Sequence, residues 1–154
     1  MNITTLKSRQ NLPKETRAGK MYDQFEKLLS ELRKKQLSDK EIITINENIN
    51  AINASTLEGS DFAKFIKTSQ IQILKCIQKE SKIVPQQYYI TLGTIIGMTG
   101  IGLPVGVAFG YALGNMGLLG LGLPIGLALG AAVGRSLDKK TLENNKQLGL
   151  AIKY

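Results

Sequence analysis

Residues 102–114 read GLPVGVAFGYALG, and residues 122–134 read GLPIGLALGAAVG. The two stretches are identical at 8 of 13 positions, so the second repeats the first at an offset of 20 residues. In each copy a glycine stands at every fourth position, and Gly93 and Gly97 show the same spacing upstream. Residues four apart lie on one face of a helix. The repeats therefore predict two helices, each with one face made of glycine.

The repeats belong to a long segment without charge. From residue 83 to residue 134, 52 consecutive positions contain no Asp, Glu, Lys or Arg. One bilayer crossing takes about 20 apolar residues, so this segment has room for two crossings and a turn. We place the crossings at about 88–113 and 118–134, within a two-helix transmembrane hairpin of residues 85–136.

The hairpin turn is predicted from Asn115 and Gly117, because the sequence Gly-Asn-Met-Gly has the composition of a turn. Pro104 and Pro124 fall inside the crossings, where each would kink a helix or begin a shorter one. A broken or re-entrant arrangement therefore remains open.

The flanks of the hairpin have the residues of a membrane interface. Tyr88 and Tyr89 precede the first crossing at the position of an aromatic belt. Basic residues lie outside both crossings, at Lys75, Lys79, Lys82, Arg135, Lys139 and Lys140. The turn has no charge, so the positive-inside rule predicts that both termini are cytoplasmic.

The N-terminal part has the apolar periodicity of three amphipathic helices, over about 21–37, 39–54 and 61–82. Ser38 and Glu41 have the spacing of a capping box at the start of the second helix. The predicted fold is all-α: a small helical bundle followed by a glycine-zipper hairpin. The predicted parts are a flexible basic arm (1–20), a three-helix soluble domain (21–84), the hairpin (85–136) and a charged tail (137–154).

The composition argues against an enzyme. The chain has no His and one Cys, which excludes a Ser-His-Asp triad, a Cys-His dyad and a His-based metal site. We expect no catalytic residue, metal or cofactor. Residues 1–82 carry 15 Lys and Arg against 10 Asp and Glu, an excess of five. No aromatic residues alternate with these charges, so they favour attraction to anionic lipids over nucleic-acid binding.

The two glycine rows, the Gly-Asn-Met-Gly turn and the following Arg-Ser-Leu-Asp-Lys-Lys resemble bacterial glycine-zipper membrane proteins, over about Gly93–Lys140. The resemblance implies close helix packing and no single activity, since similar zippers occur in pore-forming toxins, channels and membrane-anchored lipoproteins. The zipper positions are Gly93, Gly97, Gly102, Gly106, Gly110, Gly114, Gly122, Gly126, Gly130 and Gly134.

Two classes of function follow from this pattern. In the leading hypothesis, copies of the chain associate through an outer glycine face and form or gate a pore in the bacterial inner membrane. Such a toxin or defence effector would depolarise the membrane, and Thr91, Thr94 and Thr99 would help to line the pore. In the alternative, the glycines pack the hairpin against itself, and the hairpin anchors an adaptor whose residues 21–82 recruit a cytosolic protein. A soluble form that inserts later is a third possibility.

Overall fold

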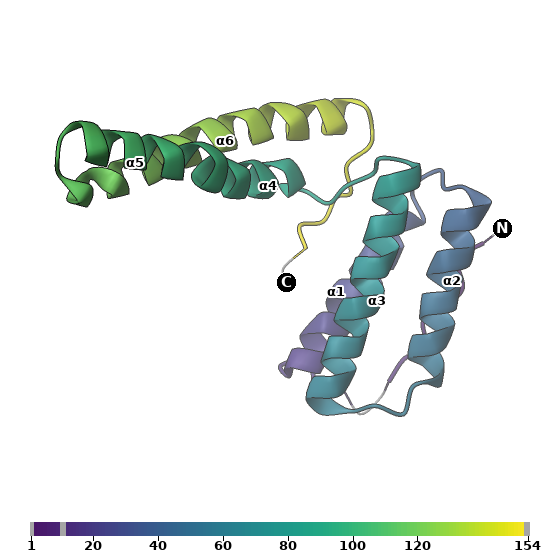
Figure 1. The fold of residues 1–154 in the computed structure, drawn as a ribbon. Helices are drawn as coiled ribbons and strands as arrows, with labels where there is room; N and C mark the ends of the chain where they lie inside the picture. The colour runs from purple at the N-terminus through teal and green to yellow at the C-terminus, as the bar shows by residue number, and fades with distance from the viewer. Residues whose placement is uncertain (1, 10–11, 153–154) are drawn as a thin grey trace. The chain divides into compact units, whose positions relative to one another are not determined.

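The computed structural model describes residues 2–9 and 12–152, apart from the side chain of Leu118 (Figure 1). The described residues form helices and connecting segments and no β-strand, which confirms the predicted all-α class. They divide into two compact units. The first contains residues 2–84 and 148–152, and the second contains residues 85–147.

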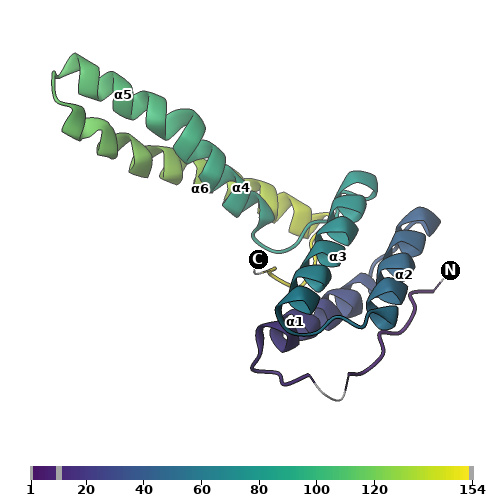
Figure 2. The same ribbon diagram turned by 60° about the horizontal axis from the view of Figure 1, so that its bottom comes forward.

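The first unit is built on α1 (Arg17–Leu32), α2 (Asp39–Ala54) and α3 (Gly59–Glu80). Helix α3 packs against both α1 and α2 (Figure 2). The apolar faces predicted from the periodicity supply its core. Each of the following side chains is at most 1% exposed: Phe25, Leu28, Leu29, Leu32, Ile45, Ile49, Ile52, Phe62, Ile66, Ile73 and Ile77.

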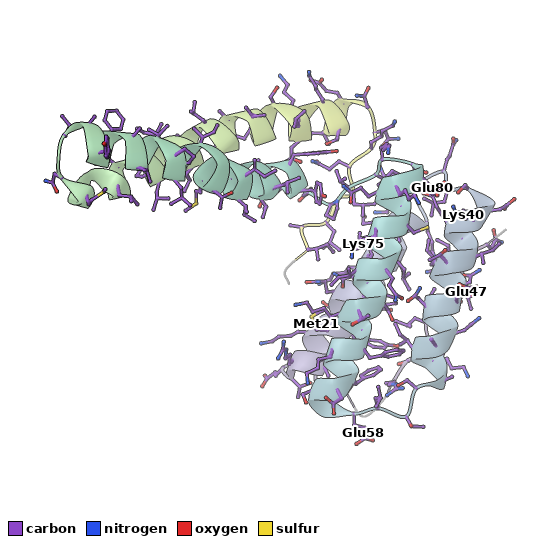
Figure 3. All side chains as sticks on the ribbon, in the orientation of Figure 1. Met21, Lys40, Glu47, Glu58, Lys75 and Glu80 are labelled. Atoms are coloured by element: carbon purple, nitrogen blue, oxygen red, sulfur yellow. The ribbon has the colours of Figure 1, made fainter. Side chains whose placement is uncertain are left out.

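The predicted capping box begins α2 and also joins it to α3. The Glu41 carboxylate accepts a hydrogen bond from the Ser38 N–H (2.7 Å), and the Ser38 hydroxyl accepts one from the Glu41 N–H. Glu41 is fully buried, and the same carboxylate oxygen accepts a bond from the Ser81 hydroxyl at 2.9 Å. An exposed ion pair between Lys40 and Glu80 (2.7 Å) links the same helix ends (Figure 3).

The described part of the N-terminal segment, which the sequence predicts as a flexible arm over residues 1–20, is hydrogen-bonded to α2. Asn46 and Asn53 stand seven residues apart on α2, and each side-chain amide bonds twice to the backbone of this segment. Asn46 accepts from the Thr4 N–H (2.7 Å) and donates to the Asn2 carbonyl (3.1 Å), while Asn53 accepts from Lys7 (2.9 Å) and donates to Thr5 (3.2 Å). These side chains satisfy backbone groups that would otherwise need water.

Arg9 holds the same segment over the loop that follows α2. Its guanidinium lies 4.0 Å from the centre of the buried Phe62 ring, a cation–π contact. It also donates to the carbonyls of Ile52, Ser55 and Leu57.

Helix α1 begins four residues earlier than predicted, because the Thr16 hydroxyl caps the Gly19 N–H. Residues 1, 10 and 11 of the predicted arm lie outside the described residues.

Replacing Asn53 by alanine should release the N-terminal segment locally. Two hydrogen bonds are lost, each contributing about 1 kcal/mol, so the amide protection of Lys7 should fall by roughly one order of magnitude. Hydrogen exchange measured by NMR would test this. Asn50→Ala is the matched control, because Asn50 is exposed on α2 and makes no hydrogen bond to the described residues of the segment. Equal protection of Lys7 in both variants would contradict the role of Asn53.

Where the sequence predicts a charged tail over residues 137–154, the structure has the end of a helix followed by a segment that returns to the first unit. Residues 137–143 continue a helix, and Leu148 is buried in the helical core at 1% exposure. The Leu148 N–H donates to the Val84 carbonyl at 2.9 Å. The first unit is therefore made from both ends of the chain, and residues 85–147 are inserted between them. Residues 153–154 lie outside the described residues.

Docking of the C-terminal segment should weaken in acid. Glu31 accepts a hydrogen bond from the Gly149 N–H (2.8 Å) and pairs with Lys34 (2.5 Å). The Lys34 side chain, and secondarily the Gly149 N–H, lower the pKa of Glu31 below its ordinary value of 4.5. A carboxyl with a lowered pKa in the folded state stabilises that state above its ordinary pKa. This stabilisation is lost as the pH falls through the lowered value.

The protection factor of the Gly149 amide, corrected for intrinsic exchange, should therefore fall as the pH drops below about 4.5. Glu31→Gln should give a protection factor that is lower at neutral pH and independent of pH in this range. An unchanged pH dependence in Glu31→Gln would show that another group controls the segment.

Candidate functional site: the glycine-packed hairpin

The second unit is a helical hairpin. Its first arm is a continuous helical stretch made of α4 (Tyr88–Ile96), the π-helical segment η1 (Gly97–Gly102) and α5 (Leu103–Ala112). A short 3₁₀ turn, η2 (Met116–Leu118), leads into α6 (Leu119–Glu143), which packs along the whole first arm (Figures 1 and 2). The two arms run in opposite directions.

The turn lies at the predicted Gly-Asn-Met-Gly sequence. Gly114 has a φ of +63°, a conformation that glycine adopts without strain. The Asn115 side-chain oxygen accepts a hydrogen bond from the Gly117 N–H at 2.9 Å. The sequence predicts Gly114 as a zipper position, but the structure makes it a turn residue. Apart from its chain neighbours, no described atom lies within 4 Å of the position that its Cβ would take.

Glycines from both arms meet face to face along the hairpin. A Cβ on Gly126 would lie 2.7 Å from the Cα of Gly102, and a Cβ on Gly130 would lie 2.7 Å from the carbonyl carbon of Gly93. No real Cβ approaches backbone this closely without displacing it. We call this contact the glycine seam, made by Gly93, Gly97, Gly102, Gly106, Gly122, Gly126, Gly130 and Gly134. Gly110 extends it toward the turn, facing Met116.

The π-helical segment keeps the first arm in register with the seam. Gly97 and Gly102 are five residues apart, whereas the other neighbouring seam glycines of this arm are four apart. In an α-helix a step of five would turn Gly102 away from α6, because each residue rotates the helix by about 100°. Segment η1 spans these five steps with wider turns, so both glycines are buried against α6.

Neither proline breaks its helix. Pro104 falls in the first turn of α5, directly after the π-helical segment, where its missing N–H is tolerated. Pro124 lies inside α6, which continues without interruption to Glu143. The re-entrant arrangement that the prolines left open is therefore absent from the described hairpin.

The position of the seam removes the predicted outer glycine face. All eight seam glycines lie between the two arms, and seven of them are buried. A second copy of the chain cannot pack its own helices against all of them unless the arms separate. The contacts match the alternative in which the glycines pack the hairpin against itself.

The outer surface of the hairpin is apolar. Its exposed large side chains include Leu92, Ile95, Ile96, Ile101, Leu103, Val107, Phe109, Tyr111, Leu121, Ile125, Leu127, Leu129 and Val133. Only 17% of the apolar window of the first arm and 22% of that of α6 is buried within the protein. A core helix of a water-soluble protein would be mostly buried. Each arm has 25 residues and is long and apolar enough to cross a membrane.

The threonines of the first arm use their hydroxyls within their own helix. Thr91 donates to Gln87 (2.9 Å), Thr94 donates to Ile90 (2.8 Å) and Thr99 donates to Ile95 (2.9 Å), in each case to the carbonyl four residues earlier. These donors are therefore satisfied without water or another chain, as an apolar environment requires.

Asp138 is a site residue that the sequence analysis misses. It is 6% exposed, and its two oxygens accept hydrogen bonds from the N–H groups of Tyr89 (3.1 Å) and Ile90 (3.0 Å). The first N–H groups of a helix have no partner within it, and α4 has no side-chain cap of its own. Asp138 of α6 supplies that cap. The sequence does contain one feature that points to this residue. Asp138 follows Gly134 by four residues and so continues the row of seam glycines on α6.

The predicted interface residues lie near the end of the hairpin that is opposite the turn. Tyr88 and Tyr89 contact each other edge to face, with ring centres 5.1 Å apart. Arg135, Lys139 and Lys140 are exposed on α6 around the end of the seam. Lys82 is exposed in the first unit, just before the hairpin begins.

No protein-family model, curated protein or solved structure matches the chain. The fold itself defines an all-α chain with two candidate membrane-spanning helices, inserted into a small helical domain.

Proposed function

We propose that this chain is a membrane-anchored adaptor. The hairpin crosses a bilayer twice and holds the helical unit of residues 2–84 and 148–152 at one membrane surface, where that unit recruits a cytosolic protein. The observation that carries the proposal is the distribution of side-chain size in the hairpin. Glycine is turned inward at the seam, and large apolar side chains are turned outward.

This distribution suits lipid as a solvent. Helices in a bilayer gain little from hydrophobic association, so close van der Waals contact between backbones is a main source of stability. The seam provides that contact within one chain. The outward leucine, isoleucine and valine side chains then face acyl chains, and the bonded threonines expose no unsatisfied donor.

The insertion of the hairpin into one domain supports a single-sided topology. Val84 and Leu148 are joined by a backbone hydrogen bond inside the first unit, so the chain enters and leaves the hairpin at the same place. Both ends of the hairpin then lie on one side of the membrane. The basic flanks favour the cytoplasmic side, which in a bacterium is the inner face of the inner membrane.

Removal of the hairpin should convert the protein into a soluble folded domain. Residues 85–147 would be replaced by a short Gly/Ser linker, which only has to join the adjacent Val84 and Leu148. The full chain should stay in the membrane pellet after alkaline carbonate extraction, and the linker variant should be soluble with a cooperative thermal transition. Extraction of the full chain by carbonate would instead favour the form that inserts later. A linker variant retained in the pellet would show that the anchor lies elsewhere.

Self-assembly into a pore is the second candidate, and one observation favours it. Each arm has a further row of small residues at four-residue spacing, Gly100, Pro104, Ala108 and Ala112 in the first and Gly120, Pro124, Ala128 and Ala132 in the second. All eight are exposed, so these rows allow two hairpins to approach closely without opening the seam.

Size-graded dye release from liposomes separates the two functions. An Ala108→Leu, Ala128→Leu double variant would fill the outer rows and leave the seam intact. Release by the full chain, lost in this variant at equal incorporation, would establish a pore assembled through the outer rows. No release from either protein, with both resistant to carbonate, is the result expected of the anchored adaptor.

A further inference from the structure

An apolar groove runs over the glycine seam, toward the end of the hairpin that is opposite the turn. It encloses about 250 Å³. Its walls come from both arms: Tyr89, Ile96 and Ile101 from the first, and Leu129, Val133 and Leu137 from α6. Seam glycines form its floor. The groove exists because glycine leaves the line of contact without side chains, while the flanking positions carry large ones.

The dimensions and chemistry of the groove suit one acyl chain. From Leu129 to Leu137 the groove follows eight residues of α6, about 12 Å at 1.5 Å per residue. One leaflet of the hydrocarbon core is roughly 15 Å deep, half of about 30 Å. No charged side chain lines the groove, so it can accept the chain of a lipid but not its headgroup.

Lys140 lies on α6 beyond the Leu137 end of the groove. Lys140 follows Leu137 by three residues and Val133 by seven, spacings that place all three on one face of α6. Lys140 is exposed, and among the described residues no carboxylate pairs with it. The neighbouring Lys139 points to another face, where it lies 3.9 Å from Glu143. The groove and Lys140 together form an apolar site with a positive charge at the end that is opposite the hairpin turn.

We propose that this groove binds one acyl chain of an anionic phospholipid, and that the phosphate of this lipid pairs with Lys140. The proposal rests on the insertion of the hairpin into a bilayer. Anionic lipid is preferred over phosphatidylcholine because the choline of the latter carries a positive charge that Lys140 repels. The lipid belongs to the leaflet at the end of the hairpin opposite the turn. Its acyl chain covers the backbone of the seam glycines in the floor of the groove.

Tryptophan fluorescence offers a direct test, because the chain has no Trp of its own. Val133→Trp places the reporter on the groove wall, and Ala132→Trp places it one residue away on an exposed position outside the groove. Both variants would be incorporated at full length into vesicles of phosphatidylcholine and phosphatidylglycerol. The acyl chains of one lipid or the other would carry bromine, a fluorescence quencher, at equal mole fraction. Circular dichroism would confirm equal helix content.

At Val133→Trp, the quenching should show that phosphatidylglycerol is enriched about fivefold over phosphatidylcholine beside the reporter. This is the preference expected from the attraction between one lysine and anionic lipid. At Ala132→Trp the two lipids should quench almost equally. Adding Lys140→Gln should abolish the enrichment at position 133, whereas Lys139→Gln, an equal change of charge one residue away, should preserve it.

Two results would overturn the proposal in different ways. Equal quenching by both lipids at position 133 would reject a lipid site at the groove, and so would an equal loss of phosphatidylglycerol enrichment in Lys140→Gln and Lys139→Gln. Either result would still be consistent with insertion of the hairpin into the bilayer. The absence of quenching at both reporters by both lipids would show that the hairpin lies outside the bilayer, and would reject the proposed function as well.

Discussion

Replacing Gly126 by alanine should separate the arms of the hairpin, although the same change stabilises an ordinary helix by about 1 kcal/mol. A Cβ at this position would lie 2.6 Å from the backbone nitrogen of Gly102 and 2.7 Å from its Cα. Backbone atoms cannot rotate away as a side chain can, so the whole first arm has to move. Overpacking of this kind costs about 1–3 kcal/mol, which reverses the sign of the helix-propensity effect.

The distance between the arms reports this change directly. Spin labels at Leu92 and Leu129, in a Cys76→Ser background, would lie on opposite walls of the groove. Electron-electron dipolar spectroscopy of the full chain in lipid should show a longer and broader distance distribution for Gly126→Ala. Gly120→Ala is the matched control on α6, because no described atom outside its own helix backbone lies within 4 Å of its Cβ position. An unchanged distance in Gly126→Ala would show that the arms do not meet at the seam.

Replacing Asp138 by alanine should loosen the end of the hairpin opposite the turn. The change removes two hydrogen bonds to a carboxylate and leaves the Tyr89 and Ile90 N–H groups without a protein partner. It also removes a negative charge from the positive end of the α4 dipole. Loss of hydrogen bonds to a charged group costs about 1.5–3 kcal/mol. The amide protection of Tyr89 and Ile90 should fall by at least tenfold.

Hydrogen exchange of these two amides would measure the effect, with Asp138→Asn as an intermediate. Asparagine retains one acceptor oxygen of similar shape, so one of the two amides should stay protected. Glu143→Gln is the control, because Glu143 is exposed on the same helix and contacts only Lys139 at 3.9 Å among the described ion pairs. Unchanged protection in Asp138→Ala would mean that water caps α4 equally well.

In the first unit, only features that depend on neighbouring residues could be predicted from the sequence. The apolar faces of the three helices and the Ser38–Glu41 capping box could be predicted, because both depend on residues within one helix or beside it. The packing of the N-terminal segment could not, because Asn46 and Asn53 look like ordinary exposed residues of α2. Their partners are backbone groups more than 40 residues away, and backbone groups have no sequence signature.

By itself the sequence determined that residues 83–134 carry no charge and contain two repeats with glycine at every fourth position, since composition and spacing are local properties. Only the tertiary structure decided which way the glycines face. A row of glycines can pack within a chain or between chains, and the choice depends on whether the opposite arm brings its own row into register. The π-helical step from Gly97 to Gly102 and the cap provided by Asp138 set that register. The cap joins residues 48 and 49 positions apart, and the π-helical step matters only because it turns Gly97 and Gly102 toward glycines of α6, so a one-dimensional pattern does not contain their outcome.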